Sequence, residues 1–495
     1  MVGVVSDFFI VLSVFLPFIG AIFIAIAGER RKNLREATTI CTAFLTFLLT
    51  TILTQRLLNG ESPFVKIIRF SNNVDFHLKV DPFGAIFANL SSFLWVFVSI
   101  YSIGYMRALK EKRQTRFYAM FATAIGSAIG VAYSGNLLTL YMFYEFLTLS
   151  TYPLVAHKES YEAIDAGRKY LAYLLSGAGA VLFGIVGIYL LYGTTDFSPG
   201  GFLAKKTDSP FLGILFFSLF FGFGTKAALM PLHEWLPSAM VAPTPVSALL
   251  HAVAVVKAGV FCVLRTVFYL FGPNLINMYE IWLISAIFAC VTVLVSNILA
   301  IYEDNLKRRL AFSTVNNLSL IILGGLLLTP SSVKGALLHM FYHGFMKITL
   351  FMCAGAFYVA TKKELVSQLH GIGKKMPHTM VPFTIGAMGL VGIPPVSGFL
   401  SKWYLCKGAI EKNEVVFLFV FLMSALLDAI YFAPIIFRGF FGNGDNEGIK
   451  NPTSFSLVLP LVFTGLASIL LFLFPDWLFH LHKLSGMVVE SVLGG

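Results

Sequence analysis

Charged residues are scarce in this sequence: they make up 12% of its 495 residues, against 57% hydrophobic residues. The mean hydropathy of +0.81 is too high for a water-soluble domain of this length. A chain of this composition belongs in a lipid bilayer. Its formal net charge of +11 lies mainly in loops between apolar runs, so we interpret it as a topology signal and predict no nucleic-acid partner.

The cysteine and glycine motifs of cofactor sites are also lacking. The five cysteines form neither CxxC pairs nor a cluster with histidines: Cys41, Cys262, Cys290, Cys353 and Cys406. No nucleotide-binding glycine motif follows a predicted strand. His233 begins a short HEWLP segment, but Pro237 stands where a zinc protease has its second histidine. The sequence therefore predicts no cofactor, no metal site and no catalytic residue in this chain.

Long hydrophobic runs, by contrast, recur from one end of the chain to the other. Runs of about 18 to 25 apolar residues are long enough to cross roughly 30 Å of hydrocarbon as helices. They predict an all-α polytopic membrane protein with about fourteen transmembrane helices, near residues 8–28, 36–54, 82–104, 117–133, 136–157, 170–192, 210–232, 246–269, 279–302, 310–329, 333–359, 379–400, 414–437 and 454–475. The first run lacks the basic start and cleavage site of a secretory signal, so we expect it to be retained.

The distribution of lysine and arginine predicts the orientation of these helices. Alternate loops are strongly basic, namely those within residues 30–35, 107–116, 158–169, 307–309, 362–375 and 438–450. The positive-inside rule places these loops on the cytoplasmic side of a prokaryotic inner membrane. With an even number of spans, both termini are then expected on the outer face.

A few basic residues remain within or at the edge of the predicted spans: Lys226, Lys257, Arg265, Lys347 and Lys402. A charge at the centre of a span costs about 2.5 to 3.5 kcal/mol on insertion scales. A structural hydrogen bond or snorkelling to the interface explains some single cases. Four such lysines together with Glu145, in the middle of the fifth span, favour ion transport.

Prolines interrupt two of the lysine-bearing spans. Lys226 stands about one turn before Pro231 in the seventh span, and Lys402 follows Pro394 and Pro395 in the twelfth. Such breaks free backbone carbonyls inside the membrane, which is tolerated where polar groups or water line a cavity. Broken helices in corresponding positions predict two inverted five-helix repeats. The expected organisation is 1–105 (spans 1–3), 117–269 (first repeat, spans 4–8), 279–438 (second repeat, spans 9–13) and 454–475 (span 14).

Histidines and lysines form a further pattern in the eleventh span. His339, His343 and Lys347 are spaced i, i+4 and i+8, which puts them along one helix face and suits a line of proton-carrying groups. Three more candidates lie in the eighth and thirteenth spans: His251, Lys257 and Asp428.

These residues suggest a mechanism. Burial disfavours the ammonium form of a lysine, and a nearby carboxylate restores it. We expect Glu145 to pair with Lys226 in one state, so that separation of the pair makes Lys226 pass its proton along the polar axis. Lys402 would release or accept the proton at the far end. Both H+ and Na+ fit these groups.

The segment TKAALMPLHEWLPSAMVAPTPVSALLHAVAVVKAGVF, together with GFLSKW, resembles the antiporter-like proton-translocating subunits shared by respiratory complex I, Mrp-type Na+/H+ antiporters and membrane-bound hydrogenase or sulfur reductase complexes. The resemblance extends over essentially the whole chain. It places the family's lysines of spans 7, 8 and 12 at Lys226, Lys257 and Lys402, and its span-five glutamate at Glu145. Lys347 matches the span-eleven lysine of some members.

The resemblance implies a fourteen-helix fold, ion conduction along a central polar axis, and association with other membrane subunits, further antiporter-like subunits included, in a lipid membrane. A histidine and a lysine in span eight, a lysine in span twelve, and no long lateral helix after span fourteen favour the D-type Mrp subunit or its hydrogenase and sulfur-reductase counterparts. Two alternatives stay open: a stand-alone secondary cation or solute/H+ transporter, and a structural membrane subunit of an oxidoreductase without transport of its own.

Overall fold

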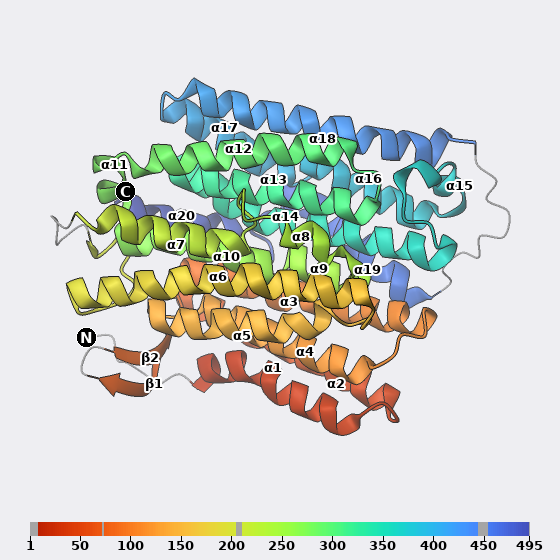
Figure 1. Ribbon diagram of the computed structural model, residues 1–495, viewed down its shortest axis with the longest axis horizontal. Helices are drawn as coiled ribbons and strands as arrows, with labels where there is room; N and C mark the ends of the chain where they lie inside the picture. The colour runs from red at the N-terminus through yellow and green to blue at the C-terminus, as the bar shows by residue number, and fades with distance from the viewer. Residues whose placement is uncertain (1–7, 72–73, 204–209, 444–453, 495) are drawn as a thin grey trace.

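The computed structural model describes residues 8–71, 74–203, 210–443 and 454–494 of the chain. They form a bundle of helices that run roughly side by side along one axis (Figure 1). The protein is mostly helical (79%), with one two-stranded sheet among the described residues. Nine helices of this part of the chain are individually long and apolar enough to cross a membrane. The total of about fourteen spans stays a prediction.

The N-terminal part consists of α1 (Phe8–Ala27), α2 (Lys32–Leu58), β1 (Phe64–Ser71), β2 (Val74–Lys79) and α3 (Pro82–Ala108). α3 begins where the sequence places strong start signals, because Asp81 accepts a hydrogen bond from the Gly84 backbone N–H and Pro82 occupies the first turn. The antiparallel hairpin of β1 and β2 corrects the all-α prediction. Its strands are short and partly polar, so they carry no signal comparable with the apolar runs.

The next region contains α4 (Gln114–Ala132), α5 (Leu137–Val155), α6 (Tyr161–Tyr192), α7 (Leu212–Lys226), α8 (Trp235–Ser238), η2 (Ala239–Val241), α9 (Thr244–Ala252), α10 (Val255–Arg265) and η3 (Thr266–Phe271). The predicted seventh span thus comprises α7 and α8, with residues 227–234 between them. The predicted eighth span is divided as well, because α9 ends at Ala252 and α10 begins at Val255. At this division the Val253 carbonyl accepts a hydrogen bond from Ser91.

The following region contains α11 (Pro273–Met278), α12 (Ile281–Tyr302), α13 (Leu306–Leu326), α14 (Pro330–Thr361), η4 (Val366–Gln368), α15 (Ile372–Lys375), α16 (Pro377–Val391), α17 (Gly398–Glu411) and α18 (Val415–Phe441). α14 is continuous over 32 residues and begins with a capping box between Thr329 and Ser332. α16 ends before the two prolines at 394 and 395, and Lys402 lies in the first turns of α17.

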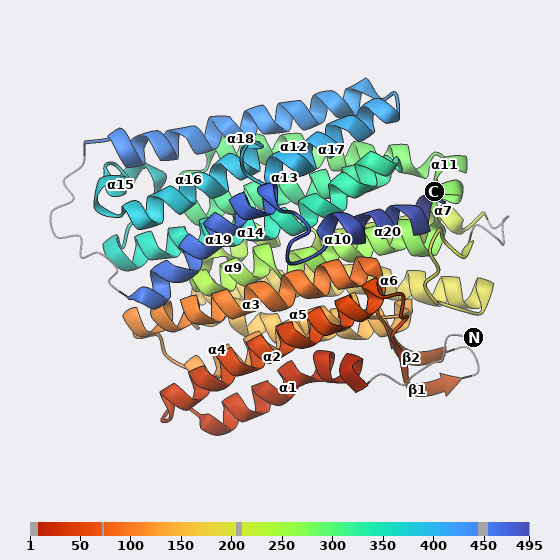
Figure 2. The same cartoon turned by 180° about the vertical axis from the view of Figure 1, so that it is seen from behind.

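The C-terminal part differs from the predicted single span at 454–475. α19 (Phe455–Leu473) is followed by a second helix, α20 (Leu481–Leu493), which the sequence analysis did not predict. α20 has 13 residues, too few to be recognised as a membrane-spanning run. Figure 2 shows that α19 and α20 follow each other along the length of the bundle.

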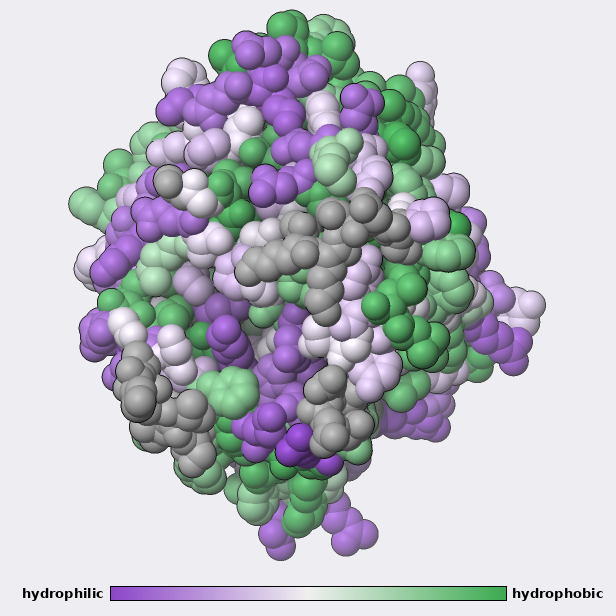
Figure 3. All heavy atoms as spheres, turned by 90° about the vertical axis from the view of Figure 1, so that its left-hand side faces the viewer, coloured by the Kyte–Doolittle hydropathy of each residue, from purple (hydrophilic) through white to green (hydrophobic). Residues whose placement is uncertain are grey.

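Burial separates central helices from peripheral ones. α3, α13 and α14 are mostly buried, whereas α1, α12, α18 and α19 bury less than half of their apolar segments. The exposed faces of the peripheral helices carry large hydrophobic side chains, as expected for contact with lipid. Figure 3 looks at the end of the bundle that carries the hairpin and the C-terminus, the predicted outer end, where hydrophilic residues lie between hydrophobic patches.

Candidate ion-translocation site

Lys226 is the last residue of α7 and is fully buried. Its Nζ donates hydrogen bonds to the Tyr144 carbonyl oxygen (2.7 Å) and to Thr148 Oγ1 (2.9 Å), both on α5. The ammonium also lies 3.2 Å from the centre of the Tyr144 ring, a cation–π contact. The groups that the Lys226 side chain contacts directly are therefore neutral.

Glu145 lies between Tyr144 and Thr148 in the sequence, and is half-buried. Its Oε1 is inaccessible to solvent and accepts no hydrogen bond from the described residues. Within this part of the chain no ion pair joins Glu145 to Lys226. Pairing of the two in another state stays a prediction.

Lys257 on α10 and His343 on α14 meet in the interior, with 2.8 Å between Lys257 Nζ and His343 Nδ1. Both are fully buried. The end of α7 packs closely on α10 at Gly259, where a Cβ would have no room against the backbone of Lys226 and Ala227. The backbone of His251 belongs to α9, but its side chain lies outside the described residues.

One turn before His343, His339 occupies the next position along the same face of α14. Its Nδ1 lies 2.8 Å from Ser401 Oγ on α17, and its Nε2 lies 3.0 Å from Asn317 Oδ1 on α13. The rings of the two histidines are 6.0 Å apart. The helical spacing found in the sequence thus produces a row of imidazoles inside the bundle.

A continuous chain of polar contacts joins the remaining lysines. Lys347 Nζ donates to Ser313 Oγ (2.8 Å), and Ser313 Oγ lies 2.7 Å from the Tyr431 hydroxyl. The Tyr431 hydroxyl is bonded to Asp428 Oδ1. Asp428 Oδ2 accepts a hydrogen bond of 2.8 Å from Lys402 Nζ. These residues come from α13, α14, α17 and α18, and their side chains are buried, with Lys402 only 10% exposed.

Asp428 is held by a further contact that the sequence analysis missed. Asn316 Nδ2 donates to Asp428 Oδ1 (3.0 Å), while Ser424 donates to Asn316 Oδ1 (3.0 Å). The neutral partners of the lysines and histidines were missed in the same way, because single serine, threonine, asparagine and tyrosine residues are common in apolar helices. The one available signal is the STVNNLS segment of α13, which is unusually polar for a buried helix.

A polar cavity of about 380 Å³ opens at the predicted inner end of the bundle, beside the short helices that follow the α7 break. Lys158, Ser238, Val241, Lys307 and Glu364 are among its lining residues. Lys307 Nζ donates to the Ala242 carbonyl oxygen (2.9 Å), which holds η2 against the start of α13.

Arg265, the fifth basic residue that the sequence places near a span, does not join this row. Its guanidinium is buried and bonds Asp81 Oδ2 at 2.5 Å. Asp81 also caps α3, so the ion pair fixes the end of α10 to the start of α3. We interpret Arg265 as structural.

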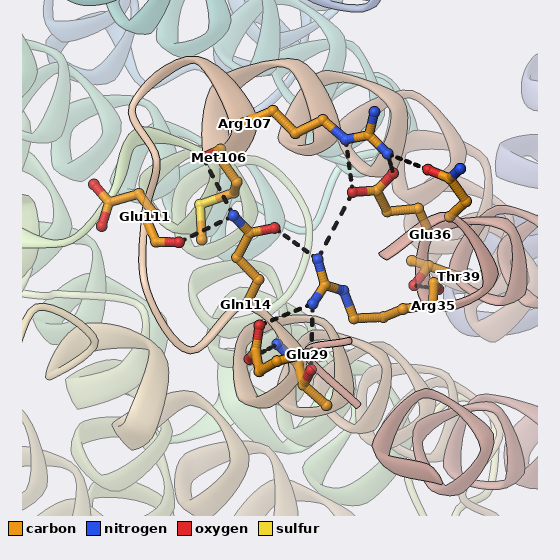
Figure 4. A network of polar contacts seen from close by, with 10 residues as sticks. Glu29, Arg35, Glu36, Thr39, Met106, Arg107, Glu111 and Gln114 are labelled. Carbon is orange, nitrogen blue, oxygen red and sulfur yellow. Dashed lines mark hydrogen bonds and ion pairs between the residues drawn. The ribbon is translucent and has the colours of Figure 1, made fainter. Parts of the chain in front are cut away.

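A second structural network lies at the inner end (Figure 4). The guanidinium of Arg35 is fully buried and donates to Glu29 Oε2 (3.0 Å) and Gln114 Oε1 (2.7 Å). It also lies 3.7 Å from Glu36, which is bonded to Arg107. The network connects α2, α3 and α4. Arg35 therefore stabilises the packing of these helices, in addition to being one of the basic residues that predict the orientation of the chain.

Among the described residues, Asp75, His77 and Asp196 have side-chain donor atoms within 4.8 Å of one another, which is a spacing compatible with a metal ion. Two of these three residues also contact other side chains: Lys66 pairs with Asp75, and Asn136 Nδ2 lies 3.2 Å from His77 Nδ1. The contact between Asn136 and His77 joins the hairpin to the start of α5.

Comparison with protein families gives two matches. Residues 134–428 match the NADH:quinone oxidoreductase/Mrp antiporter transmembrane family, and residues 68–118 match the N-terminus of chain 5 of NADH-ubiquinone oxidoreductase (complex I). The first match includes α5, the α7 break and Lys402, and it ends at Asp428.

Two curated relatives represent the sequence similarity. NADH-quinone oxidoreductase subunit N of Desulforudis audaxviator is 31% identical over 421 residues, which cover 81% of this chain and 82% of that one. One component of a probable K(+)/H(+) antiporter of Rhizobium meliloti is 32% identical over 346 residues, which cover 69% of this chain and 34% of that one. The chain spans about half the length of chloroplast NAD(P)H-quinone oxidoreductase subunits 5, such as that of Nuphar advena.

Two solved structures share the fold. A chain of the Mrp complex from Dietzia sp. superposes with a TM-score of 0.83 at 20% identity, covering 98% of this chain and 97% of that one. A chain of the membrane-bound sulfane sulfur reductase, an archaeal respiratory membrane complex, superposes with a TM-score of 0.87 at 23% identity, covering 98% of each. This chain therefore belongs to the antiporter-like membrane subunits of the NADH:quinone oxidoreductase/Mrp antiporter family.

Proposed function

We propose that this chain moves H+, with Na+ as the alternative ion, along its row of buried polar groups, as one subunit of a multisubunit energy-converting complex in a prokaryotic cell membrane. The observation that carries the proposal is the unbroken contact from Lys347 through Ser313, Tyr431 and Asp428 to Lys402. Replacement of a buried ion pair by apolar residues is often neutral or stabilising, so stability alone gives little reason to keep one here.

The chemistry of this row suits proton transfer. A hydroxyl group both donates and accepts, so Ser313 and Tyr431 can pass a proton from the Lys347 ammonium toward the Asp428 carboxylate. The transfer leaves a neutral amine at Lys347 and a neutral acid at Asp428, which weakens the attraction between Asp428 and Lys402. Lys402 can then lose its own proton toward the outer or inner side.

The first half of the row works through a change of partner. In the described conformation the Lys226 ammonium is bonded to neutral groups, with the Glu145 carboxylate one residue away from Tyr144 in the sequence. A small shift of α7 against α5 would exchange these contacts for an ion pair with Glu145. The ion pair would favour the charged lysine, and its separation would favour proton release toward Lys257.

The helix interruptions are the expected moving parts of the proposed mechanism. Residues 227–234 and 392–397 adjoin Lys226 and Lys402, and we assign them to the predicted inverted repeats, 117–269 and 279–438. The polar cavity lined by Pro237 and Ser238 of α8 lies close in the sequence to the first break, and we propose that ions enter from it. Both termini would face outward.

Membership of a larger complex is supported by the relatives. They are named as subunits of NADH-quinone oxidoreductase and of an antiporter, and both solved neighbours are parts of complexes. We propose that the partners are other membrane subunits, including further antiporter-like ones. This chain would then supply ion movement and its neighbours the electron chemistry.

The test is cation-dependent proton movement in vesicles that contain the native complex. Lys226→Ala and Glu145→Gln should abolish it at equal assembly, whereas Lys374→Ala, at an exposed lysine of the inner end, should not change it. Unchanged transport in Lys226→Ala would make this lysine a structural residue and the chain a scaffold.

A further inference from the structure

The backbone leaves helical geometry between α19 and α20, and this interruption lies inside the thickness of the bundle. The Phe479 ring packs on Phe93 of α3 and on Phe341 of α14, with ring centres 5.1 and 4.8 Å apart. Each of these two residues lies eleven positions after the first residue of its helix, about 16 Å along it. Residues 474–480 are therefore well below the outer end, as Figure 2 also shows.

Apart from the buried Phe479, most residues of this interruption are exposed on the outside of the bundle. Trp477 is 77% exposed and Phe474 is 59% exposed. Asp476 and Lys483 are also exposed. A tryptophan, an acid and a base thus share one lateral surface at a depth where lipid chains would surround the isolated chain.

Asp476 cannot leave this depth by turning toward water. Its Oδ1 accepts hydrogen bonds from the backbone N–H groups of His482 (2.7 Å) and Lys483 (3.3 Å), which caps the first turn of α20. An aspartate side chain is also too short to reach the interface, unlike that of a lysine. The carboxylate is therefore fixed on the lateral surface by the fold.

Such a surface is incompatible with hydrocarbon. Irregular backbone and charged groups inside a membrane occur where they are buried in protein or line a water-filled cavity. Charge complementarity defines what must cover it: a hydrogen-bond donor or cation opposite Asp476, an acceptor opposite Lys483, and apolar surface for Trp477.

We propose that the surface formed by Phe474, Asp476, Trp477 and Lys483 is the docking site for a transmembrane helix of a different subunit, with a basic or amide side chain facing Asp476. The inference rests on the part of the proposed function that places this chain in a complex. It does not depend on ion transport by the chain.

Photocrosslinking tests the contact directly. p-Benzoylphenylalanine at position 477 of the chain, irradiated in native membranes within the assembled complex, should form an adduct with another membrane subunit of the purified complex. The same group at position 479, where the native side chain is buried, should react only within the chain and so shows that the probe is active. Adducts at position 477 with lipid alone, or with a second copy of this chain, would overturn the proposal.

Assembly provides the second readout. Asp476→Lys should lower the fraction of the chain that copurifies with the complex at least fivefold, whereas Glu490→Gln, at an exposed acid of α20, should leave it unchanged. Full assembly of Asp476→Lys would contradict the proposal. A Lys226→Ala complex that assembles and still transports ions would overturn the proposed ion pathway but leave this inference intact, so the two proposals fail separately.

Discussion

The two lysines that adjoin proline-interrupted spans have contrasting surroundings. Lys226 precedes its break and is held by a carbonyl, a hydroxyl and an aromatic face, with Glu145 nearby and unpaired to it. Lys402 follows its break and forms an ion pair with Asp428, which three helices support. Lys226 thus has neutral partners, whereas Lys402, beside the same kind of interruption, has a charged one.

The difference shows which half can change state at lower cost. In the proposed mechanism, Lys226 exchanges its contacts with Tyr144 and Thr148 for one with Glu145, and no ion pair has to break. Lys402 must lose a direct pair in a low-dielectric interior, unless a proton first neutralises Asp428. We therefore expect control to begin at the first site and the second site to respond.

The largest expected effect is on stability, and it comes from removing the carboxylate that pairs with Lys402. Asp428→Ala leaves Lys402 buried without its partner, so the free energy of unfolding should fall by about 3–5 kcal/mol. Glu145→Gln should change it by less than about 1 kcal/mol, since that carboxylate has no bonded partner among the described residues. Thermal unfolding of the purified complex, followed by intrinsic fluorescence, measures both, and equal losses would remove the contrast between the sites.

Replacing the whole ion pair sharpens the comparison. In Lys402→Met/Asp428→Leu most of the lost stability should return, because apolar residues of similar volume remove both buried charges. Transport should stay at least about tenfold below wild type, since about 1.4 kcal/mol of barrier already corresponds to this factor. Vesicle transport together with a double-mutant cycle on stability reports both quantities. Recovered transport in the double variant would show that the pair only supports the fold.

A smaller effect is expected from two tyrosines. Tyr431→Phe removes the hydroxyl between Ser313 and Asp428, and the loss of a hydrogen bond to a charged group, about 1.5–3 kcal/mol, should slow transport roughly tenfold or more. Tyr144→Phe keeps the carbonyl and the ring that Lys226 contacts, so transport should change less than about twofold. Equal rates in the two variants would mean that protons do not pass through Tyr431.

The smallest effect concerns a carboxylate outside the membrane, which serves as a reference for the buried ones. Burial opposes the charge of Asp75, but its contacts with Lys66 and His77 outweigh this and hold its pKa below the ordinary 3.8. The charged form therefore stabilises the hairpin above about pH 4, and the contribution is lost as pH falls through the lower, folded-state pKa.

Since Asp75 lies near the surface, this contribution should stay below about 1 kcal/mol. Hydrogen exchange of β1 and β2 should therefore become faster below about pH 4, after correction for intrinsic exchange. Asp75→Asn should remove the change. An identical pH dependence in that variant would assign the effect to another group.

The sequence alone predicted the parts of the molecule that depend on strong signals. Membrane character follows from the apolar runs, and the family from the resemblance of the segments around Lys226 and Lys402. The prolines close to these two lysines predict broken spans there. The i, i+4, i+8 spacing of His339, His343 and Lys347 is enough to predict that they share one face of a helix. The partners were not predictable, because Lys347 reaches Asp428 through Ser313 and Tyr431, which are more than a hundred residues apart in the chain.

Weak local signals account for the other differences. The hairpin and α20 are short, and α9 and α10 are separated by only two residues, so neither length nor composition marks them. Glu145 was expected beside Lys226, and its neighbours Tyr144 and Thr148 make the contacts instead. A sequence shows which residues carry charge, whereas tertiary packing decides which neutral atoms bind them.

The uninterrupted course of α14 has a mechanical consequence. A helix without internal proline keeps its residues at fixed spacing, so His339 and Lys347 stay about 12 Å apart along its axis whatever the rest of the bundle does. We therefore expect α14 to stay rigid. Any conformational change of the proposed pathway is then expected in the helices that contact it, α9, α10, α16 and α17. Conformational change in the protein would then consist of movements of these divided helices relative to a fixed α14.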